Sequence, residues 1–546
     1  MVAVTGSVRD RGADGAVAVG GGTSRGRVDL AIDLGVAAAL IGLALTLRWP
    51  ALDPSSLWLD DAWVALVDRT SGWQELRSVG FAAPGFAALL QGWFAVVGFS
   101  ELTAQLPALV AGVLTPAAAY LVACWRGWHR AGALVAGVVL AVGPVTVTYA
   151  TRVKQYTLEG LLGVVLLALA LWLLDDRTDP RRWAIFVGAG AVGTVVSAFL
   201  APTVAAGLAA AMVASLVERD RAGARWAAGW GVLYGAGALA WYLVVLAPAV
   251  TSSISGFWAD DFLVVGEGPG ALLGSLGTAW AGVLRGFLPL GEAGVPVVLA
   301  TGVLVLAGVA LALAGGGVAG GPDRGHRGPV LAVLLLTPSL VAVGLAALQL
   351  APLGGGRTDL YLYPSLALLL AAGTDVVLRW TQRWRQLAIG ASVAVLGVAV
   401  SLVLVAEPVA GYPRYDVRPL VGTMEAEAGS DDALLIYPAT VWAYALYTST
   451  DIHLEPDPVS SWGFYPRFAD PRVVVLPPGR DDPDAYRPTV AALGAETDAE
   501  VVWLLASHWR EDIEDLGAQL EAVGFSGTEV ERRDGARLVR WERRDG

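Results

Sequence analysis

Two adjacent carboxylates, Asp60 and Asp61, stand between two tryptophans near the start of the chain, with Trp58 before them and Trp63 after them. Charged groups among apolar side chains are costly to desolvate, which favours a functional role. A carboxylate in a half-buried pocket can act as a general base. The alternative is a solvated loop that carries two acids.

A second polar segment holds cations. Arg152, Lys154 and Glu159 lie close together, with Tyr156 between them. Lys154 is the only lysine in a chain whose 37 basic residues are otherwise arginine. Its compact ammonium suits a phosphate or a carboxylate and is not equivalent to a guanidinium, although one lysine can also survive by chance. Glu159 either neutralises a neighbouring cation or joins the acid pair.

A third segment places Arg357 directly after three glycines, 354–356, and before Tyr361 and Pro364. Glycine lets the backbone approach a ligand or a helix closely. Arg357 has two interpretations: a fork of donors to phosphate oxygens, or an anchor that reaches up to lipid headgroups. Asp260 and Asp261 either line a lid or are solvated.

The composition places these polar segments in a membrane protein. Of the 546 residues, 55% are hydrophobic and only 16% are charged, and the mean hydropathy is +0.59. The single cysteine, Cys124, excludes an intramolecular disulfide and a cysteine-based metal site. No P-loop motif is present, which argues against an ATP-driven pump.

Eleven apolar stretches approach the length that a membrane-spanning helix needs. They are 29–47, 104–123, 131–149, 160–174, 183–200, 203–217, 226–247, 294–315, 329–350, 359–378 and 387–406. Two further stretches, 81–99 and 271–290, are interrupted by glycine and polar residues. These two are short spans or surface helices.

The arginines decide between these interpretations. If 81–99 and 271–290 do not cross, 17 of the 24 basic residues before residue 407 fall on one side of the membrane. The positive-inside rule then predicts about eleven spans in a plasma-membrane protein with a cytoplasmic N-terminus. The expected domains are a cytoplasmic tail (1–28), a transmembrane catalytic domain (29–406) and an extracytoplasmic domain (407–546). The acid pair and the three cations fall on the external side.

The last 140 residues carry 26 acidic and 13 basic residues, so they account for the whole net charge of −12. Strand-like and helix-like segments alternate from residue 433 and end in a hairpin near 528–541 with Asp534-Gly535 at its turn. We therefore expect a small soluble α/β domain with a parallel core. Its acidity argues against nucleic acid as a partner. Acceptor recognition and a structural cap are both open as roles.

The order of these features resembles a known family. An acidic pair in the first external loop is followed by a helix opening at Pro84, a span containing Leu106-Pro107, a loop with arginine and an acid, and Arg357 before a tyrosine–proline segment. This order over residues 30–406 resembles the GT-C class of integral-membrane glycosyltransferases. Protein O-mannosyltransferases and bacterial lipid A aminoarabinose transferases are the most similar members in style.

The resemblance implies roles for individual residues. Asp60 falls on the catalytic base, Asp61 on a position usually held by glutamate, and Glu159 on an acid that is often aspartate. Arg357 falls on a binder of the lipid phosphate. Gln105 departs from the family, which often has arginine there; Arg152 or Lys154 would then supply the charge. The candidate substrate contacts are Trp58, Trp63, Tyr156 and Gln105.

The implied reaction is a single displacement with inversion. A polyprenyl-phosphate sugar enters from the membrane lipids, and an acceptor hydroxyl on a lipid, glycan or protein attacks the anomeric carbon as Asp60 takes its proton. Arg152, Lys154 and Arg357 stabilise the departing phosphate. No cofactor is required, although two acids beside a phosphate could hold a divalent metal ion. The alternatives are a transporter or flippase, an oligosaccharide-transferring enzyme of the same class, and a non-catalytic assembly factor.

Overall fold

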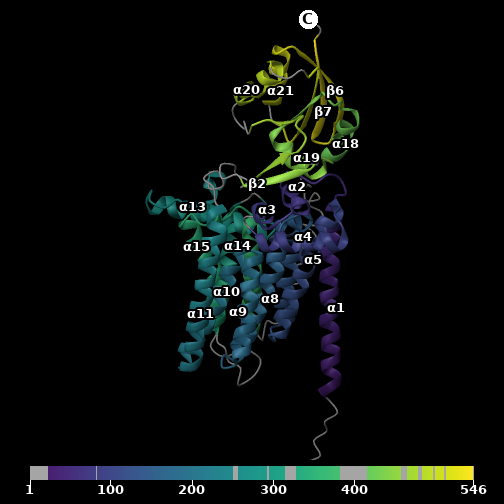
Figure 1. Ribbon diagram of the computed structural model, residues 1–546. Helices are drawn as coiled ribbons and strands as arrows, with labels where there is room; N and C mark the ends of the chain where they lie inside the picture. Colours follow the sequence, from purple (N-terminus) through teal and green to yellow (C-terminus); the bar gives the residue numbers. More distant parts are fainter. Residues whose placement is uncertain are drawn as a thin grey trace, which may run out of the picture.

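The computed structural model describes residues 22–80, 83–249, 256–291, 294–313, 328–380, 415–456, 464–477, 483–495, 499–509 and 512–544. A bundle of long helices forms the larger part, and a smaller α/β part sits on one end of it (Figure 1). The predicted fold class, an α-helical polytopic membrane protein with a C-terminal α/β domain, is confirmed.

The helices of the larger part are α1 (Gly22–Arg48), α2 (Leu59–Ala65), α3 (Trp73–Val79), α4 (Pro84–Val97), α5 (Glu101–Trp125), α6 (Arg130–Val142), α7 (Pro144–Thr148), α8 (Tyr156–Asp175), α9 (Pro180–Val196), α10 (Ala201–Val217), α11 (Arg221–Trp241), α13 (Pro269–Phe287), α14 (Gly294–Leu313), α15 (Gly328–Ala347) and α16 (Tyr363–Trp380). Short 3-10 turns that matter below are η2 (Leu66–Arg69), η4 (Ala198–Leu200) and η8 (Arg357–Leu362).

Eight helices in the described residues are long and apolar enough to cross a membrane, or ten if each of two bent pairs counts as one span. The predicted span 131–149 is one of these pairs, α6 and α7, bent by 57° where Gly143 and Pro144 end one helix and begin the next. The predicted span 183–200 corresponds to α9, which has 17 residues and is not among the eight candidate spans. The predicted span 387–406 lies outside the described residues.

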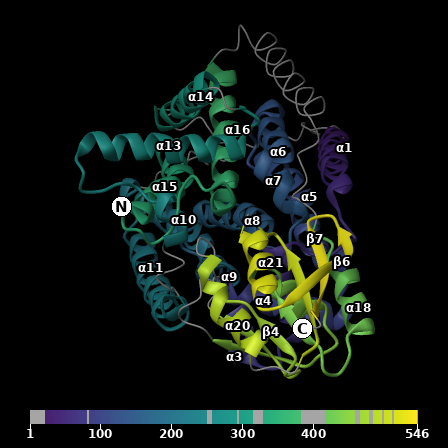
Figure 2. The same ribbon diagram turned by 90° about the horizontal axis from the view of Figure 1, so that it is seen from above.

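The two uncertain stretches differ from straight spans. Residues 84–97 form α4, which is bent by 113° relative to α3. Residues 269–287 form α13, which is not among the eight candidate spans. Seen from above, α13 is drawn along its length across the end of the bundle (Figure 2). An orientation along the membrane surface fits this helix.

Small residues let the helices of the bundle approach closely, as is common in membranes. A side chain built at Gly132 of α6 would come within 2.5 Å of the carbonyl oxygen of Ala371 in α16. The α16 side of the contact is almost fully buried, with Leu366, Ala367 and Leu368 each at 1% exposure or less. Helix α16 therefore runs through the centre of the bundle, and η8 at its start is fixed there.

The C-terminal part contains α18 (Val417–Glu427), α19 (Val441–Tyr447), α20 (Arg487–Ala495) and α21 (Asp512–Ala522). Its strands are β1 (Ala433–Ile436), β2 (Ile452–Pro456), β3 (Phe464–Phe468), β4 (Val473–Val475), β5 (Val501–Ser507), β6 (Phe525–Arg533) and β7 (Ala536–Arg543). The main sheet has the order β4-β1-β5-β7-β6.

This sheet matches the expected organisation. Strands β4, β1 and β5 are parallel, with Leu435 opposite both Val474 and Leu504. Strands β6 and β7 form the predicted terminal hairpin, whose turn contains Gly535 at a φ of 64°. The antiparallel pair β2–β3 was not predicted.

The C-terminal part packs directly on the loop that carries the acid pair. One hydrophobic cluster contains Ala62 and Leu66 from the loop together with Trp442 and Tyr444 from α19. Figures 1 and 2 agree that this part covers the α2–α4 side of the bundle and leaves the α13–α14 side uncovered. Residues 52–104 and the C-terminal part are therefore packed as one structural unit.

Candidate active site

The acid pair lies in the first turn of α2. This helix begins at Leu59, directly after Trp58. Asp60 and Asp61 are 8% and 3% exposed. The positive end of the helix dipole favours negative charge in this turn. The two acids are therefore buried, and the role of Asp60 as a general base stays a prediction.

Asp60 is paired with Arg357, although 297 residues separate them in the chain. The Arg357 guanidinium donates a hydrogen bond of 3.0 Å to Asp60 Oδ2. The pair joins the first loop to η8 at the start of the central helix α16. The proposed base and the proposed phosphate binder therefore lie in direct contact with each other.

The triple glycine positions Arg357. Gly354 and Gly356 have φ angles of 90° and 74°, a backbone region that glycine adopts without strain. The buried carboxylate of Asp359 accepts hydrogen bonds from the backbone N–H groups of both glycines, at 3.1 and 3.0 Å. A side chain at Gly354 would collide with Ala279 of α13. The turn is thus locked between Asp359 and α13.

Asp61 is held by the second cationic segment. Its carboxylate lies 3.2 Å from Arg152 Nε and accepts a hydrogen bond of 3.1 Å from the backbone N–H of Val153. Burial raises the pKa of Asp61, and Arg152 and Lys154 act in the opposite direction. Both acids are therefore neutralised by an arginine, one from each of two distant segments.

Lys154 is 7% exposed, and none of the salt bridges between described residues includes it. Its ammonium lies over the ring of Trp63, 4.7 Å from the ring centroid. Burial lowers the pKa of Lys154, and the charges of Asp60 and Asp61 raise it. Counted by themselves, these two carboxylates and three cations carry a net charge of +1 when Lys154 is protonated, and the partly buried Asp261 is a third acid that interacts with Arg357. A buried group of several cations is suited to an anion.

Each cation of this cluster lies on an aromatic face. Arg152 is 4.5 Å from the Trp58 ring centroid, and Arg357 is 5.0 Å from that of Trp258. Such contacts stabilise a desolvated cation by about 0.5–2 kcal/mol. The sequence reasoning missed Trp258, and the position of this aromatic residue two residues before Asp260 was its one available signal. Asp260 itself is exposed, and Asp261 is partly buried.

Glu159 lies apart from the ion pairs. It is fully buried near the start of α8, where Ser197 Oγ donates a hydrogen bond of 2.6 Å to it. No described contact joins Glu159 to Asp60 or Asp61. Its partner Ser197, at the end of α9, was not singled out from the sequence. The sequence-based role of Glu159 as a catalytic acid stays a prediction.

Two of the candidate substrate contacts, Gln105 and Tyr156, are engaged in contacts within the fold. Gln105 donates hydrogen bonds to the backbone oxygens of Asp53 and Glu101, at 2.6 and 2.9 Å. It therefore fastens the first loop to α5. Tyr156 is 8% exposed and packs edge-to-face on Tyr149 at 5.2 Å. Trp58 and Trp63 are the candidate contacts that adjoin the cluster directly.

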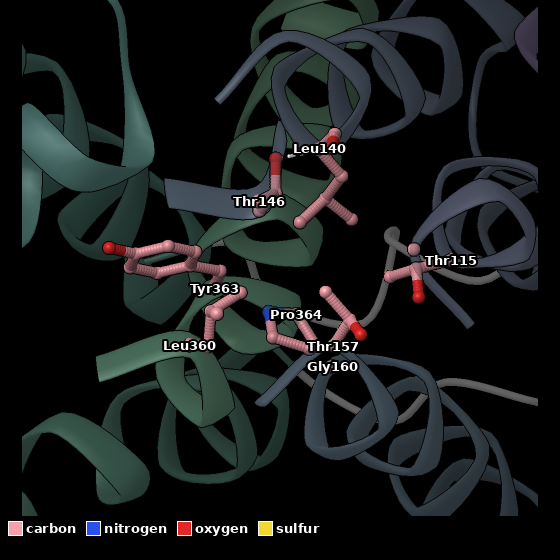
Figure 3. Close-up of a pocket in the computed structure, with 9 residues that line it drawn as sticks. Thr115, Leu140, Thr146, Thr157, Gly160, Leu360, Tyr363 and Pro364 are labelled. Atoms are coloured by element: carbon pink, nitrogen blue, oxygen red, sulfur yellow. Dashed lines mark hydrogen bonds between the residues drawn. The ribbon is translucent and has the colours of Figure 1, made fainter. Parts of the chain in front are cut away.

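A small cavity of about 10 Å³ lies inside the bundle below η8. Its lining residues come from α5, α6, α7, α8, η8 and the start of α16, and Figure 3 shows them around the cavity; they are Gly112, Thr115, Leu140, Thr146, Thr157, Gly160, Leu360, Tyr363 and Pro364. This volume has room for about one water molecule. It is too small for a sugar phosphate.

The described residues contain no group of three or more His, Cys, Asp or Glu side chains placed to hold a metal ion. Asp60 and Asp61 point their carboxylates to two different arginines. In this arrangement the pair is not a preformed metal site.

Sequence comparison finds no matching family model and no matching curated protein. Solved structures do match. ArnT from Cupriavidus metallidurans in the apo state is 14% identical, with a TM-score of 0.52 over 95% of this chain and 98% of ArnT. The structure of the same protein bound to undecaprenyl phosphate is 13% identical, with a TM-score of 0.50 over 93% of this chain and 98% of ArnT.

The archaeal oligosaccharyltransferase AglB from Archaeoglobus fulgidus is 13% identical, with a TM-score of 0.46 over 91% of this chain and 72% of AglB. The similarity to ArnT spans the bundle and the C-terminal part together. The resemblance stated from the sequence is thereby confirmed for the fold. The chain has the fold of the GT-C integral-membrane glycosyltransferases.

Proposed function

We propose that this protein is a membrane glycosyltransferase that moves a sugar from a polyprenyl phosphate to an acceptor hydroxyl. The observation that carries the proposal is the buried cluster of Asp60, Asp61, Arg152, Lys154 and Arg357 at one end of a GT-C bundle. The fold supports the proposal because ArnT, whose structure aligns with nearly the whole chain, has been solved with undecaprenyl phosphate bound.

The three cations are the donor site in this proposal. The donor's phosphate enters a place where two arginines and one lysine already converge. Hydrogen bonds and charges that are fixed before the reaction stabilise a leaving phosphate strongly in a site of low dielectric. Arg152 and Arg357 supply forks of donors, and Lys154 supplies a point charge.

Asp60 is the general base. The acceptor oxygen forms a bond to the anomeric carbon while the bond from that carbon to the phosphate oxygen breaks, which inverts the configuration. The hydroxyl proton passes to Asp60, and the electron pair of the broken bond leaves with the polyprenyl phosphate. Asp61 binds Arg152 and the backbone N–H of Val153 and so holds both against α2.

The pair between Asp60 and Arg357 gives this scheme an order. While Arg357 donates to Asp60, one oxygen of this carboxylate is occupied by the guanidinium. A donor phosphate competes for the same guanidinium, so donor binding releases Asp60 for the acceptor. The base therefore becomes active after the donor has bound.

The external face of the plasma membrane is the expected location of this site, with the N-terminus in the cytoplasm. The distribution of arginines supports it. The acceptor class is a lipid, a glycan or a protein. No metal takes part in the scheme, and a transfer rate that is unchanged by a chelator is the expected result.

The test is transfer of radiolabelled sugar from polyprenyl-phosphate sugars in membranes that contain the full chain. Asp60→Asn keeps the size of the side chain but removes the base. Asp68→Asn makes the same exchange at an exposed position of the same loop and is the matched control. We expect transfer by the wild type and by Asp68→Asn, and near-complete loss in Asp60→Asn. Equal transfer by all three proteins would remove Asp60 from the mechanism, and transport without transfer would favour the flippase alternative.

A further inference from the structure

The sheet of the C-terminal part faces the first loop with the edge at which β1 and β5 end. Strands β1 and β5 are parallel, and both end toward the first loop. Helix α19, which follows β1, packs on α2 in the shared hydrophobic cluster. His508 follows β5 directly. In open α/β sheets, the edge at the carboxyl ends of the strands is where ligands usually bind.

His508 reaches the cluster through one ring. Its imidazole meets Trp58 edge-on, with centroids 6.3 Å apart and an interplanar angle of 79°. Trp58 in turn contacts Arg152. The Arg152 guanidinium lies 4.5 Å from the Trp58 ring centroid, and its Nε lies 3.2 Å from the Asp61 carboxylate. A continuous path of contacts thus runs from β5 to the acid pair.

The backbone fixes His508 in a demanding conformation. Its φ angle is 51°, a region that few residues other than glycine adopt. The turn between β6 and β7 holds it there: the His508 N–H donates to the Gly535 oxygen at 3.3 Å, and the Asp416 N–H donates to the Asp534 oxygen at 2.9 Å. The same turn therefore also fixes Tyr415, whose ring packs on His508 at 5.0 Å.

We propose that His508 is a positioning residue of the donor site, which holds Trp58 so that Arg152 is aimed at the donor phosphate. This inference rests on the proposed function and assigns the C-terminal part a role in donor binding, in place of a passive cap. The constrained backbone of His508 holds its ring against Trp58. Such a constraint is expected where the position of a binding side chain must be kept. His508 touches neither of the reacting groups in this arrangement.

The experiment compares three substitutions in the full chain. His508→Asn removes the ring but keeps a residue that tolerates this backbone region. His508→Phe keeps a ring of similar size. His453→Asn makes the first exchange at an exposed strand position of the same domain and is the control. The affinity for polyprenyl phosphate is measured by direct titration, and kcat and KM for the donor and acceptor are measured by transfer.

We expect His508→Asn to weaken polyprenyl phosphate binding and raise the donor KM by about 3- to 10-fold, the range of one aromatic contact. The acceptor KM should not change. His508→Phe should recover most of the loss, and His453→Asn should match the wild type. In a Trp58→Leu background, His508→Asn should have no further effect, because both substitutions interrupt the same path.

Wild-type affinity and donor KM in His508→Asn would overturn the inference. Additive losses in the double variant would also overturn it, because they indicate a general structural role. The titration separates this inference from the proposed function. A wild type that binds polyprenyl phosphate but transfers no sugar would refute the transferase, and the binding data would still decide the role of His508.

Discussion

The two ends of the helical bundle both carry ion pairs, but they balance charge differently. At the end opposite the acid pair, Arg126 pairs with Asp175 at 2.9 Å, and Arg379 pairs with Asp375 at 2.8 Å. Arg130 contacts both Asp29 and Asp33. Each of these cations has its own acid, and several of the side chains are partly exposed.

At the end that carries the acid pair, three cations surround two acids, and each cation lies over an aromatic ring. The comparison teaches that an ion pair alone does not mark a site in this protein. Pairs at the opposite end fasten short turns between helices. Burying several charges together is costly, and in the function proposed above the phosphate of the donor binds to this cluster.

The largest expected effect is on catalysis. Asp60→Asn should lower kcat for sugar transfer by about 10²–10⁴-fold, the usual contribution of a general base. Asp175→Asn, the same exchange in a pair at the opposite end, should stay within about twofold of the wild type. Steady-state transfer rates with purified protein check both. Similar losses in the two variants would break the distinction between the ends.

A smaller loss is expected at the donor site. Arg357→Gln should lower kcat/KM for the donor by about 10²-fold, because it removes a fixed charge-assisted donor to the leaving phosphate. Arg126→Gln at the opposite end is the matched control. The lower kcat/KM of Arg357→Gln should be found when the donor concentration is varied at a saturating acceptor concentration. An unchanged kcat/KM in Arg357→Gln would exclude this arginine from the donor site.

Stability should respond to pH through Lys154. Burial lowers the pKa of this lysine below its ordinary value of 10.5, so the unfolded chain binds the proton more tightly. Stability therefore rises with pH from the lowered folded pKa up to 10.5. Lys154→Met should raise the melting temperature by about 2–4 °C at neutral pH, with a gain that shrinks toward pH 10, while donor binding weakens.

Melting curves of the wild type and Lys154→Met, recorded in one detergent from pH 7 to 10, measure this difference. A variant that is less stable than the wild type throughout that range would show that Lys154 stabilises the fold. The positive charge would then be structural, as it is at the opposite end.

The last prediction concerns the junction with the C-terminal part. The Arg69 guanidinium donates hydrogen bonds to the backbone oxygens of Ala445, Thr448 and Thr450 at 2.6–2.9 Å. Arg69→Ala should lower the free energy of unfolding by about 1–3 kcal/mol. Arg467→Ala, in an exposed pair on β3, should cost less than about 1 kcal/mol. Denaturant titration compares the two, and equal costs would argue against a tight junction.

Much of this molecule follows from local sequence patterns. Apolar length predicted the eight candidate spans among the described residues, and alternating segments predicted the main sheet with its terminal hairpin. The acids and cations of the cluster could be named because each sits in a short polar segment between apolar runs. Their pairing could not be predicted, since Asp60 and Arg357 meet only through the packing of the first loop against η8.

Contacts between distant segments account for what was missed. Trp258 lies over Arg357 without any repeat or spacing that links them. Asp359 supports the glycine turn through the backbone, which leaves no pattern in side-chain types. Glu159 shows the reverse case: its sequence neighbours are cations, yet its hydrogen-bond partner Ser197 comes from another helix. Proximity along the chain was a poor guide to that partner.

The central claim is that the cluster binds the phosphate of a polyprenyl lipid. Its most direct test is titration of the purified full chain with a polyprenyl phosphate, comparing the wild type, the double variant Lys154→Met/Arg357→Gln and Arg126→Gln. The account predicts an affinity at least about 10-fold weaker in the double variant and unchanged affinity in Arg126→Gln. Equal affinity in all three proteins would contradict it.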